Sequence, residues 1–429
     1  MILTEDAFSI ESAVIKSLMK TKFRRENSEK YKEKIAELNG EKVSVYIHIP
    51  LCRSFCYACP YFKERVRKDI ESKYVDALRK EIKLYGELLP DIKIVDIHFG
   101  GGTPSLISPE DYGKVIQELE SRFDVKCRAG IEANPEDMRD SSKVSKFIDN
   151  GIGEISLGVQ TFNERNLRYL GRAHSVEDSI SAIQNCKESG IELLNIDLMY
   201  MLPGEVLEDW RKDLEIAQEL DVYQITCYPL LVLKSTPIFR MMRRNEIPQQ
   251  PDMLAFRRMF FETIEILRNY NQVELYSFAK GKRQYQTVEL EMSGPLVALG
   301  AGGIGFTGNF EYANVHSVKS YLKLLSEERL PISVARGVSY RERAIRITMA
   351  KLISIKFKMG FEKDFSDISK FINLLNIFGL LNVKGDKVEI NRELLFIFNR
   401  FCWAFVLNIP CMICDKLKKE HFPEQITVP

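Results

Sequence analysis

The sequence predicts an α/β fold, namely a partial (β/α)6 barrel of the TIM type followed by a small C-terminal α+β accessory domain. Between residues 43 and 230, short β-type runs alternate with helical stretches, an order typical of parallel strands joined by right-handed crossovers. One side of these strands is polar. A sheet buried under helices on both faces would be almost wholly apolar, so the polar side is expected to line a cavity.

Six βα units fit this region. Strands are expected near residues 43–49, 94–99, 127–133, 154–160, 192–199 and 222–228, and helices near 70–88, 108–122, 137–150, 175–189 and 205–219. Polar residues alternate with Val, Ile and Leu along the strands; they are Tyr46, His48, Asp96, His98, Glu132, Asn134, Ser156, Gly158, Gln160, Asn195, Asp197, Gln224 and Thr226. Burying them without partners would cost at least about 1 kcal/mol each, so a polar ligand and water are expected inside the barrel.

Four parts of the chain are predicted: an N-terminal helical extension (1–40), the barrel (41–232), a segment that caps its mouth (233–325) and the accessory domain (326–429). The extension is expected to be helical over residues 10–40. Further helices are predicted near 252–271, 317–327 and 339–358, with a Gly-rich loop at 300–308 and a hairpin near 376–391. The accessory domain carries no motif that indicates its role.

The composition of the chain favours some classes of function over others. The 429 residues are 45% hydrophobic, and 61 Lys and Arg against 60 Asp and Glu leave a net charge of +1, which favours a small-molecule ligand over nucleic acid or an anionic membrane. With neither a signal peptide nor an apolar run of about 18 residues, the protein is expected to be cytoplasmic and without a membrane span. Nine cysteines, an odd number, favour reduced thiols and a metal site over disulfides.

Three of the cysteines form the most informative motif. Cys52, Cys56 and Cys59 have the spacing Cys-x3-Cys-x2-Cys directly after the first predicted strand. Three thiolates on one loop can hold a metal cluster and leave a coordination position open for chemistry. The carboxyl end of a strand is also where α/β barrels place their active sites. A structural zinc site completed by a distant His or Cys is the disfavoured alternative.

A glycine-rich loop follows the second predicted strand. Gly100-Gly101-Gly102-Thr103-Pro104-Ser105 lacks bulky side chains, so its backbone carbonyls can approach a bound ammonium group closely. Alone it would be a turn, but one strand away from the cysteine loop it indicates a binding site. Gly300–Gly305 matches G-x-G-x-x-G, but no helix is expected to follow it, so nicotinamide binding is disfavoured.

The order of these motifs resembles the radical SAM superfamily, and in particular its oxygen-independent coproporphyrinogen III dehydrogenase (HemN) and HemW-like group. The resemblance covers roughly residues 43–230 and includes the motifs Tyr46-Ile47-His48-Ile49-Pro50, Glu132-Ala133-Asn134-Pro135, Gly158-Val159-Gln160, Leu170-Gly171-Arg172-Ala173-His174 and Asp197-Leu198-Met199-Tyr200-Met201-Leu202-Pro203-Gly204. It implies a radical SAM barrel with a [4Fe-4S] cluster on Cys52, Cys56 and Cys59. The open iron would bind S-adenosylmethionine, which one electron cleaves to a 5′-deoxyadenosyl radical.

The same resemblance implies the remaining cofactor contacts and partners. It places Gly101, Gly102 and Thr103 at the methionine amine, Tyr46 beside the sulfonium, Glu132, Gln160 and Asp197 at the ribose or methionine, and Arg172 at a carboxylate. One S-adenosylmethionine is implied, with a second as an open alternative. Reduced flavodoxin or ferredoxin is the implied electron donor. No catalytic residue is identified.

The chain departs from the group at several positions. Tyr61 stands where the dehydrogenase carries a fourth cysteine, and Lys282–Glu289 lacks the His-Asn and Tyr-Trp signature of the heme chaperones. In the resembled group, the loop at Gly300–Gly305 lies near a second S-adenosylmethionine or the substrate. Cys-x2-Cys is a ligand spacing, yet core packing is favoured over a second metal site because the surrounding segment is apolar; the candidate ligands are Cys402, Cys411, Cys414 and His421.

The resulting hypothesis is a radical SAM oxidoreductase that acts on a bulky conjugated small molecule. A tetrapyrrole is the implied substrate, as for a coproporphyrinogen III oxidase-like enzyme of porphyrin metabolism. Two alternatives stay open. One is a HemN-like class C methyltransferase or heme-degrading enzyme that uses two S-adenosylmethionine molecules, and the other is a non-catalytic heme-binding carrier.

Overall fold

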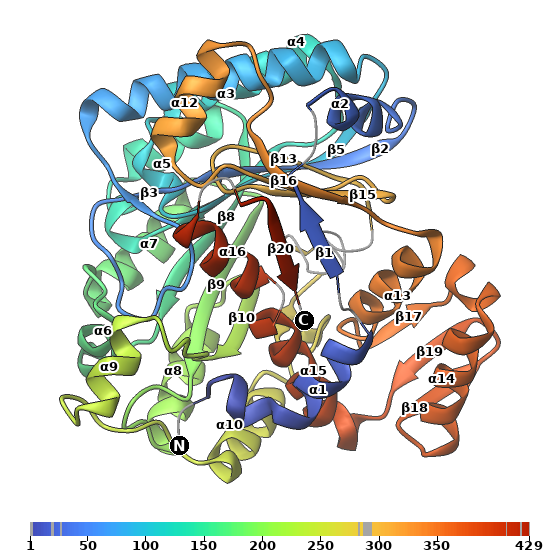
Figure 1. The fold of residues 1–429 in the computed structure, drawn as a ribbon. Coiled ribbons are helices and arrows are strands. Elements are labelled where there is room, and N and C mark those ends of the chain that lie inside the picture. Colours follow the sequence, from blue (N-terminus) through green and yellow to red (C-terminus); the bar gives the residue numbers. More distant parts are fainter. Residues whose placement is uncertain are drawn as a thin grey trace.

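A curved, mixed β-sheet forms the centre of the protein, with helices on its outer side (Figure 1). The structure, a computed structural model, describes residues 3–18, 21–25, 28–281, 284–285, 294–408, 410–420 and 423–428. Fifteen strands belong to this sheet, and a three-stranded and a two-stranded sheet complete the described elements.

The six predicted parallel strands lie side by side in chain order, each parallel to the next. They are β2 (Lys42–Ile49), β5 (Lys93–Gly101), β7 (Ala129–Ala133), β8 (Ile152–Gln160), β9 (Leu193–Tyr200) and β10 (Gln224–Pro229). The connecting helices are α3 (Lys68–Leu88), α4 (Pro109–Arg122), α5 (Ser141–Asp149), α6 (Glu164–Leu170), α7 (Val176–Glu188) and α8 (Leu207–Glu219). Outside this set, β2 pairs with β13 (Leu296–Leu299) and β10 with β12 (Ser277–Ala279). The predicted fold class, a partial (β/α)6 barrel, is confirmed.

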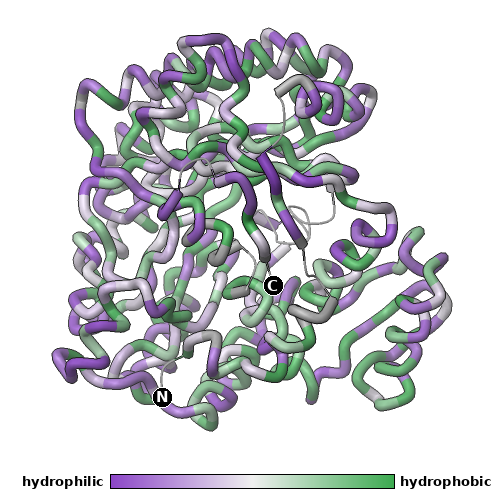
Figure 2. The backbone as a smooth tube through the Cα atoms, in the orientation of Figure 1, coloured by the Kyte–Doolittle hydropathy of each residue, from purple (hydrophilic) through white to green (hydrophobic). Residues whose placement is uncertain are grey.

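Apolar and polar residues alternate along the strands, which explains why helices cover one side of the sheet. Ile47, Ile97 and Ile155 point away from the barrel interior and are at most 1% exposed. Burying a side chain of this size contributes roughly 1.5–3 kcal/mol. The covering helices are amphipathic; in α3, Tyr74, Leu78, Ile82 and Tyr85 recur at helical spacing and are buried. Figure 2 shows hydrophobic and hydrophilic residues interspersed along both the strands and the covering helices.

The polar inner face is partly satisfied within the protein. Asn195 donates from Nδ2 to the Ser156 hydroxyl (2.8 Å) and accepts from the Thr226 hydroxyl (2.9 Å). Tyr285, from the segment after β12, is buried with its hydroxyl 3.1 Å from His98 Nδ1. Its backbone N–H donates to Gln224 Oε1 (2.8 Å). Protein groups therefore fill the end of the barrel where the strands begin, and the expected cavity is confined to their carboxyl ends.

Beyond β13 the sheet continues with antiparallel strands and brings the two ends of the chain together. These strands are β14 (Ile304–Phe306), β15 (Phe310–Asn314), β16 (Ile332–Gly337), β1 (Thr21–Arg24) and β20 (Gln425–Val428). The expectation of one helix over residues 10–40 was wrong, because β1 separates α1 (Ser9–Leu18) from α2 (Ser28–Ala36). Phe23 of β1 is in register with Ile426 of β20. Such long-range pairing leaves no local pattern for sequence analysis to detect.

The C-terminal region contains a small subdomain and two helices that return to the barrel. α13 (Tyr340–Lys351) ends before the predicted 358, because β17 (Lys356–Lys358) pairs with β19 (Lys387–Ile390). The predicted hairpin is β18 (Leu381–Lys384) with β19, preceded by the unpredicted α14 (Ser366–Ile377). α15 (Leu395–Asn408) then contacts α1, and α16 (Pro410–Lys419) follows it. The division into four parts stays a prediction.

Other described elements are β3 (Leu51–Cys52), β4 (Glu64–Arg65), β6 (Asp124–Val125), α9 (Pro237–Arg243), α10 (Met253–Ile266), β11 (Asn271–Gln272) and α12 (Val318–Ser326). Across the residues that the structure covers, none of the helices has the length and apolar character needed to span a bilayer.

A buried ion cluster joins α13 to the antiparallel half of the sheet. Glu311 of β15 accepts hydrogen bonds from Arg346 (2.7 Å) and Arg336 (2.9 Å), and its side chain is 8% exposed. Arg336 also contacts Glu342 (3.0 Å). The cluster is neutral only while both carboxylates are present.

We expect Glu311→Ala to lower the free energy of unfolding by about 3–5 kcal/mol, because it leaves excess positive charge in a buried site. Glu327→Ala is the control: Glu327 pairs with Arg329 at 3.2 Å, but both side chains are exposed, so the expected change is about 1 kcal/mol or less. Urea denaturation measures both, and similar effects would contradict a structural role for the buried cluster.

Candidate cofactor site and active site

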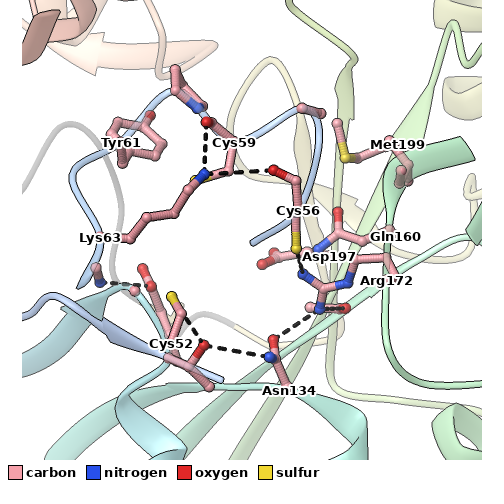
Figure 3. Close-up of a pocket in the computed structure, with 18 of the residues that line it drawn as sticks. Cys52, Cys56, Cys59, Tyr61, Lys63, Asn134, Gln160, Arg172, Asp197 and Met199 are labelled. Atoms are coloured by element: carbon pink, nitrogen blue, oxygen red, sulfur yellow. Dashed lines mark hydrogen bonds between the residues drawn. The ribbon is translucent and has the colours of Figure 1, made fainter. Parts of the chain in front are cut away.

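One cavity of about 340 Å³ lies at the carboxyl ends of the six parallel strands (Figure 3). The predicted site residues that line it are Cys52, Cys56, Cys59, Gly101, Gly102, Thr103, Glu132, Gln160, Arg172 and Asp197. Tyr46 is not in the lining. Its hydroxyl is 3.0 Å from His48 Nδ1, and its ring stacks on His98 at a centroid distance of 5.9 Å. The structure therefore places Tyr46 beneath the glycine loop.

Backbone hydrogen bonds hold the cysteine loop, which connects β2 to α3. The Tyr57 N–H donates to the Leu170 carbonyl at the end of α6 (2.9 Å), and the Tyr57 carbonyl accepts from Ile238 N–H at the start of α9 (3.1 Å). Lys63 donates from Nζ to the Cys59 carbonyl (3.0 Å). β3 and β4 pair in parallel and close the base of the loop. The loop is thus fixed at its base and at its middle.

The three thiols surround the cavity rather than converge on a point (Figure 3). Within the described residues, no three His, Cys, Asp or Glu side chains could hold a single metal ion. Thiols spread around a volume fit the separate irons of a cluster better than one zinc ion. The Thr103 hydroxyl lies 3.6 Å from Cys52 Sγ and can donate to it. Burial raises the pKa of the Cys52 thiol to about 11, so a bound metal is needed to keep it as a thiolate.

Close packing explains the run of three glycines. A Cβ on Gly100 would lie 2.9 Å from the Tyr46 ring, and one on Gly102 would lie 2.8 Å from the Leu51 carbonyl oxygen. Gly101 has a φ of +117°, which other residues rarely adopt. The Gly102 N–H donates to the Ile49 carbonyl (2.7 Å). The loop therefore runs along the chain that leads into Cys52.

Three residues at successive strand ends form the polar side of the cavity. Glu132 of β7 accepts a hydrogen bond from Gly101 N–H (3.0 Å). Asp197 of β9 accepts from Asn195 Nδ2 (2.9 Å), and its burial, followed by the charge of Glu132, raises its pKa to about 7. Gln160 of β8 has a φ of +71° and accepts from the Tyr228 hydroxyl (3.1 Å). That backbone costs about 1–3 kcal/mol in a residue other than glycine, a strain typical of functional sites.

Arg172 connects the cysteine loop to the strand ends. Its Nη1 is 3.4 Å from Cys56 Sγ, and its Nη2 donates to Asn134 Oδ1 (2.8 Å) and to the Gly158 carbonyl (2.9 Å). Its Nε is buried and has no hydrogen-bond partner among the described residues. A Cβ on Gly158 would lie 2.9 Å from Gln160 Nε2, so this glycine makes room for its neighbours.

Sequence analysis missed part of the lining. Asn134 and Met199 belong to motifs that were recognised, and Tyr228 is the final residue of the last predicted strand. Trp403 and Val406 of α15 also line the cavity, and nothing near them in the sequence indicated this. Other missed residues include Lys63, Leu106, Glu136, Leu230, Leu231 and Leu233.

Several other sequence predictions concern residues away from the cavity. Gly300–Gly305 is not in the lining, and Gly300 N–H donates to the buried Glu81 (2.8 Å). The strand β14 begins at Ile304, within the motif, so no helix follows it. Cys402 is a buried free thiol. The side chains of Cys411 and Cys414 lie outside the described residues, as do His421, Lys282, Arg283 and residues 286–289.

Known proteins are similar to this chain in sequence and in architecture. A sequence model of the Radical SAM superfamily matches residues 46–217. The heme chaperone HemW of Lactococcus lactis is 28% identical over 344 residues, covering 77% of this chain and 89% of that protein. HemW of Haemophilus influenzae is 30% identical over 307 residues, covering 67% and 79%.

Among solved structures, coproporphyrinogen III oxidase (HemN) from Escherichia coli, described as a radical SAM enzyme, superimposes with a TM-score of 0.76. It is 21% identical and covers 89% of this chain and 94% of its own, a likeness that establishes the fold. The cofactors of this superfamily are a [4Fe-4S] cluster and S-adenosylmethionine. The chain therefore belongs to the radical SAM superfamily, within the HemN/HemW-like family.

Proposed function

We propose that this protein is a radical SAM enzyme that acts on a tetrapyrrole. In this proposal Cys52, Cys56 and Cys59 hold the cluster, and S-adenosylmethionine lies along the polar side of the cavity. One observation carries the proposal: three thiols, a loop without side chains and the polar ends of neighbouring strands surround a single cavity. The names of the relatives, heme chaperone and coproporphyrinogen III oxidase, support the substrate class.

When bound, the cluster and S-adenosylmethionine supply a 5′-deoxyadenosyl radical through one-electron cleavage of the sulfonium. The protein's part is to bind, orient and shield. Thr103 and Arg172 donate to the sulfurs of Cys52 and Cys56, which stabilises thiolate charge. Lys63 holds the loop backbone and adds a positive charge beside the cluster. Reduced flavodoxin or ferredoxin is the proposed electron donor.

The polar side suits the rest of the cofactor. Carbonyls of Gly101 and Gly102 can approach its ammonium group without obstruction. Asp197 and Gln160 offer acceptors for ribose hydroxyls, and the guanidinium group of Arg172, which lines the cavity, suits a carboxylate. Glu132, held by Gly101 N–H, is a further acceptor. Each of these groups is already fixed by a protein partner, so little ordering is needed on binding.

The second candidate is a heme carrier, favoured by the HemW relatives. Proteins usually hold heme iron through an axial His, Cys, Met or Tyr. Four histidines within the described residues are buried, and none of them lines the cavity; they are His48, His98, His174 and His316. His421 lies outside the described residues. Met199, Tyr61 and Tyr228 do line the cavity. Among the described residues, a carrier would therefore have to ligate heme iron there through Met or Tyr instead of His.

We expect Cys56→Ala to lose iron, acid-labile sulfide and the cluster's absorbance after anaerobic reconstitution, because one of three ligands is gone. Cys186→Ala is the matched control, since Cys186 is a buried thiol on α7 outside the cavity. Circular dichroism checks that both variants are folded. Equal iron loading in the two variants would remove Cys56 from the cluster site.

Asp197→Asn should weaken S-adenosylmethionine binding about 10- to 100-fold, because a charge-assisted hydrogen bond is lost. The raised pKa also predicts pH dependence: with a pKa of about 7, ionisation above pH 7 creates the better acceptor. Wild-type affinity should therefore rise about tenfold from pH 6 to pH 8. Calorimetric titration at both pH values measures this. The Asn variant controls for titration of the cofactor's own groups, and the same pH dependence in both proteins would contradict a role for Asp197.

The reaction itself is tested with reconstituted protein, S-adenosylmethionine and dithionite under anaerobic conditions. We expect 5′-deoxyadenosine to form, and its rate to rise when coproporphyrinogen III or heme is added, because bound substrate consumes the radical productively. Chromatography with mass detection measures 5′-deoxyadenosine and product. Stoichiometric heme uptake without cleavage would support the carrier instead, and a methylated product would support a methyltransferase.

A further inference from the structure

The C-terminal helix α15 forms part of the cavity wall. Trp403 and Val406 line the same cavity as Cys52 and Gln160, although more than 240 residues separate them from Gln160. Figure 1 shows α15 and α16 over the open side of the curved sheet. A segment from outside the barrel therefore completes the site.

The Trp403 ring is fixed in position. Its centroid lies 5.1 Å from that of Tyr276 and 6.4 Å from that of Tyr228, and its Nε1 donates to Asn399 Oδ1 (2.8 Å). The indole N–H is therefore already satisfied within α15. What remains for a ligand is apolar aromatic surface, and Tyr228 links this surface to Gln160 through a hydrogen bond of 3.1 Å.

The cavity has two chemically different sides. Acceptors and donors suited to a charged cofactor come from the strand ends and the glycine loop. The lining also contains a set of apolar side chains, here called the apolar side; they are Leu230, Leu231, Leu233, Trp403 and Val406. Met199 lies beside Gln160 (Figure 3). The side chains of the apolar side offer nothing to the charged groups of S-adenosylmethionine. An apolar side that includes a fixed aromatic ring suits a flat, conjugated ligand.

Cavity size supports the same division. A volume of about 340 Å³ lies at the low end of the range for ligand pockets, roughly 300–1,000 Å³. With a cluster and a cofactor inside, little space is left for a macrocycle. Only part of a large substrate can then enter the cavity, and the apolar side chains are the part of the lining that the charged groups of the cofactor do not use.

Contacts with other parts of the chain hold both α15 and α16 in place. Arg400 of α15 contacts the Glu11 carboxylate (2.6 Å) and lies over the Phe8 ring. Lys418 of α16 donates to the Pro60 carbonyl, in the segment that follows Cys59. α15 is therefore held by the N-terminal segment, and the pair reaches the cysteine loop.

We propose that Trp403, supported by Val406, forms the surface on which a planar conjugated substrate packs. It is a specificity residue that the C-terminal region contributes to the barrel. The inference rests on the proposed function, since it assigns the substrate side of that site. It predicts that changes at Trp403 lower substrate affinity more than cofactor affinity.

The test uses reconstituted full-length protein titrated with coproporphyrin III, followed by porphyrin absorbance, and separately with S-adenosylmethionine. We expect Trp403→Ala to weaken porphyrin binding about tenfold, and Trp403→Phe to restore most of it, because an aromatic face returns. Val406→Asp, at a half-buried position, should weaken it similarly and serves if Trp403→Ala does not fold. Phe378→Ala removes an exposed aromatic far from the cavity and should change nothing. In Trp403→Ala the loss of porphyrin affinity should exceed any loss of S-adenosylmethionine affinity, whereas Phe378→Ala should change neither affinity nor cleavage without substrate.

The outcomes separate this inference from the proposed function. Equal porphyrin affinity in wild type, Trp403→Ala and Val406→Asp would overturn the role of Trp403 and leave the enzyme proposal intact. Cofactor cleavage without any porphyrin binding by the wild type would overturn both the tetrapyrrole substrate and the role of Trp403. Porphyrin binding that depends on Trp403 without cofactor cleavage would support this inference while the enzyme proposal fails.

Discussion

Alternation of apolar and polar residues along six parallel strands is the constraint on which both the fold and the site depend. The apolar residues, such as Ile47 and Ile155, bind the sheet to its helices. The polar residues must then all face inward, because a shift of one residue would reverse every side chain. Inside, Asn195 and Tyr285 satisfy groups near the strand starts, and the cavity lies at the carboxyl ends. The site is thus a consequence of how the core is buried.

The order of the strands in the sheet brings the residues of the proposed cofactor site together. Because neighbouring strands follow one another in the chain, the loop or residue that ends each strand lies beside the next: the cysteines after β2, the glycine loop after β5, Glu132 on β7, Gln160 on β8 and Asp197 on β9. Hydrogen bonds between these loops and strands then fix the distances between them. Arg172 spans from Cys56 to Asn134, and Glu132 holds the glycine loop. Loss of one contact is therefore expected to affect several ligands of the cofactor together.

Local signals account for what the sequence could predict. The six strands, the cysteine loop and the glycine loop all follow from short patterns, and ten of the predicted site residues line one cavity. Tyr46 does not, because its place in a strand fixes its face but not its depth beneath Gly100. The pairing of β1 with β20, which divides the predicted N-terminal helix, and the contact of α15 with the cavity depend on residues far apart in the chain. Hydrophobic periodicity carries no information about such partners.

The apolar character of α15 has two explanations that only the structure separates. A helix that packs in a core and a helix that faces a flat conjugated ligand both need apolar and aromatic residues. From the sequence alone, either helix would be interpreted as part of the core. Here α15 does both: Ala404 is fully buried in the core, while Trp403 and Val406 line the cavity. The cofactor side is built from strands whose register the whole fold fixes, whereas the apolar side is completed by a helix added from outside the barrel. Changes in that helix can therefore alter which substrate is accepted while the cysteine loop and the strand ends keep their geometry.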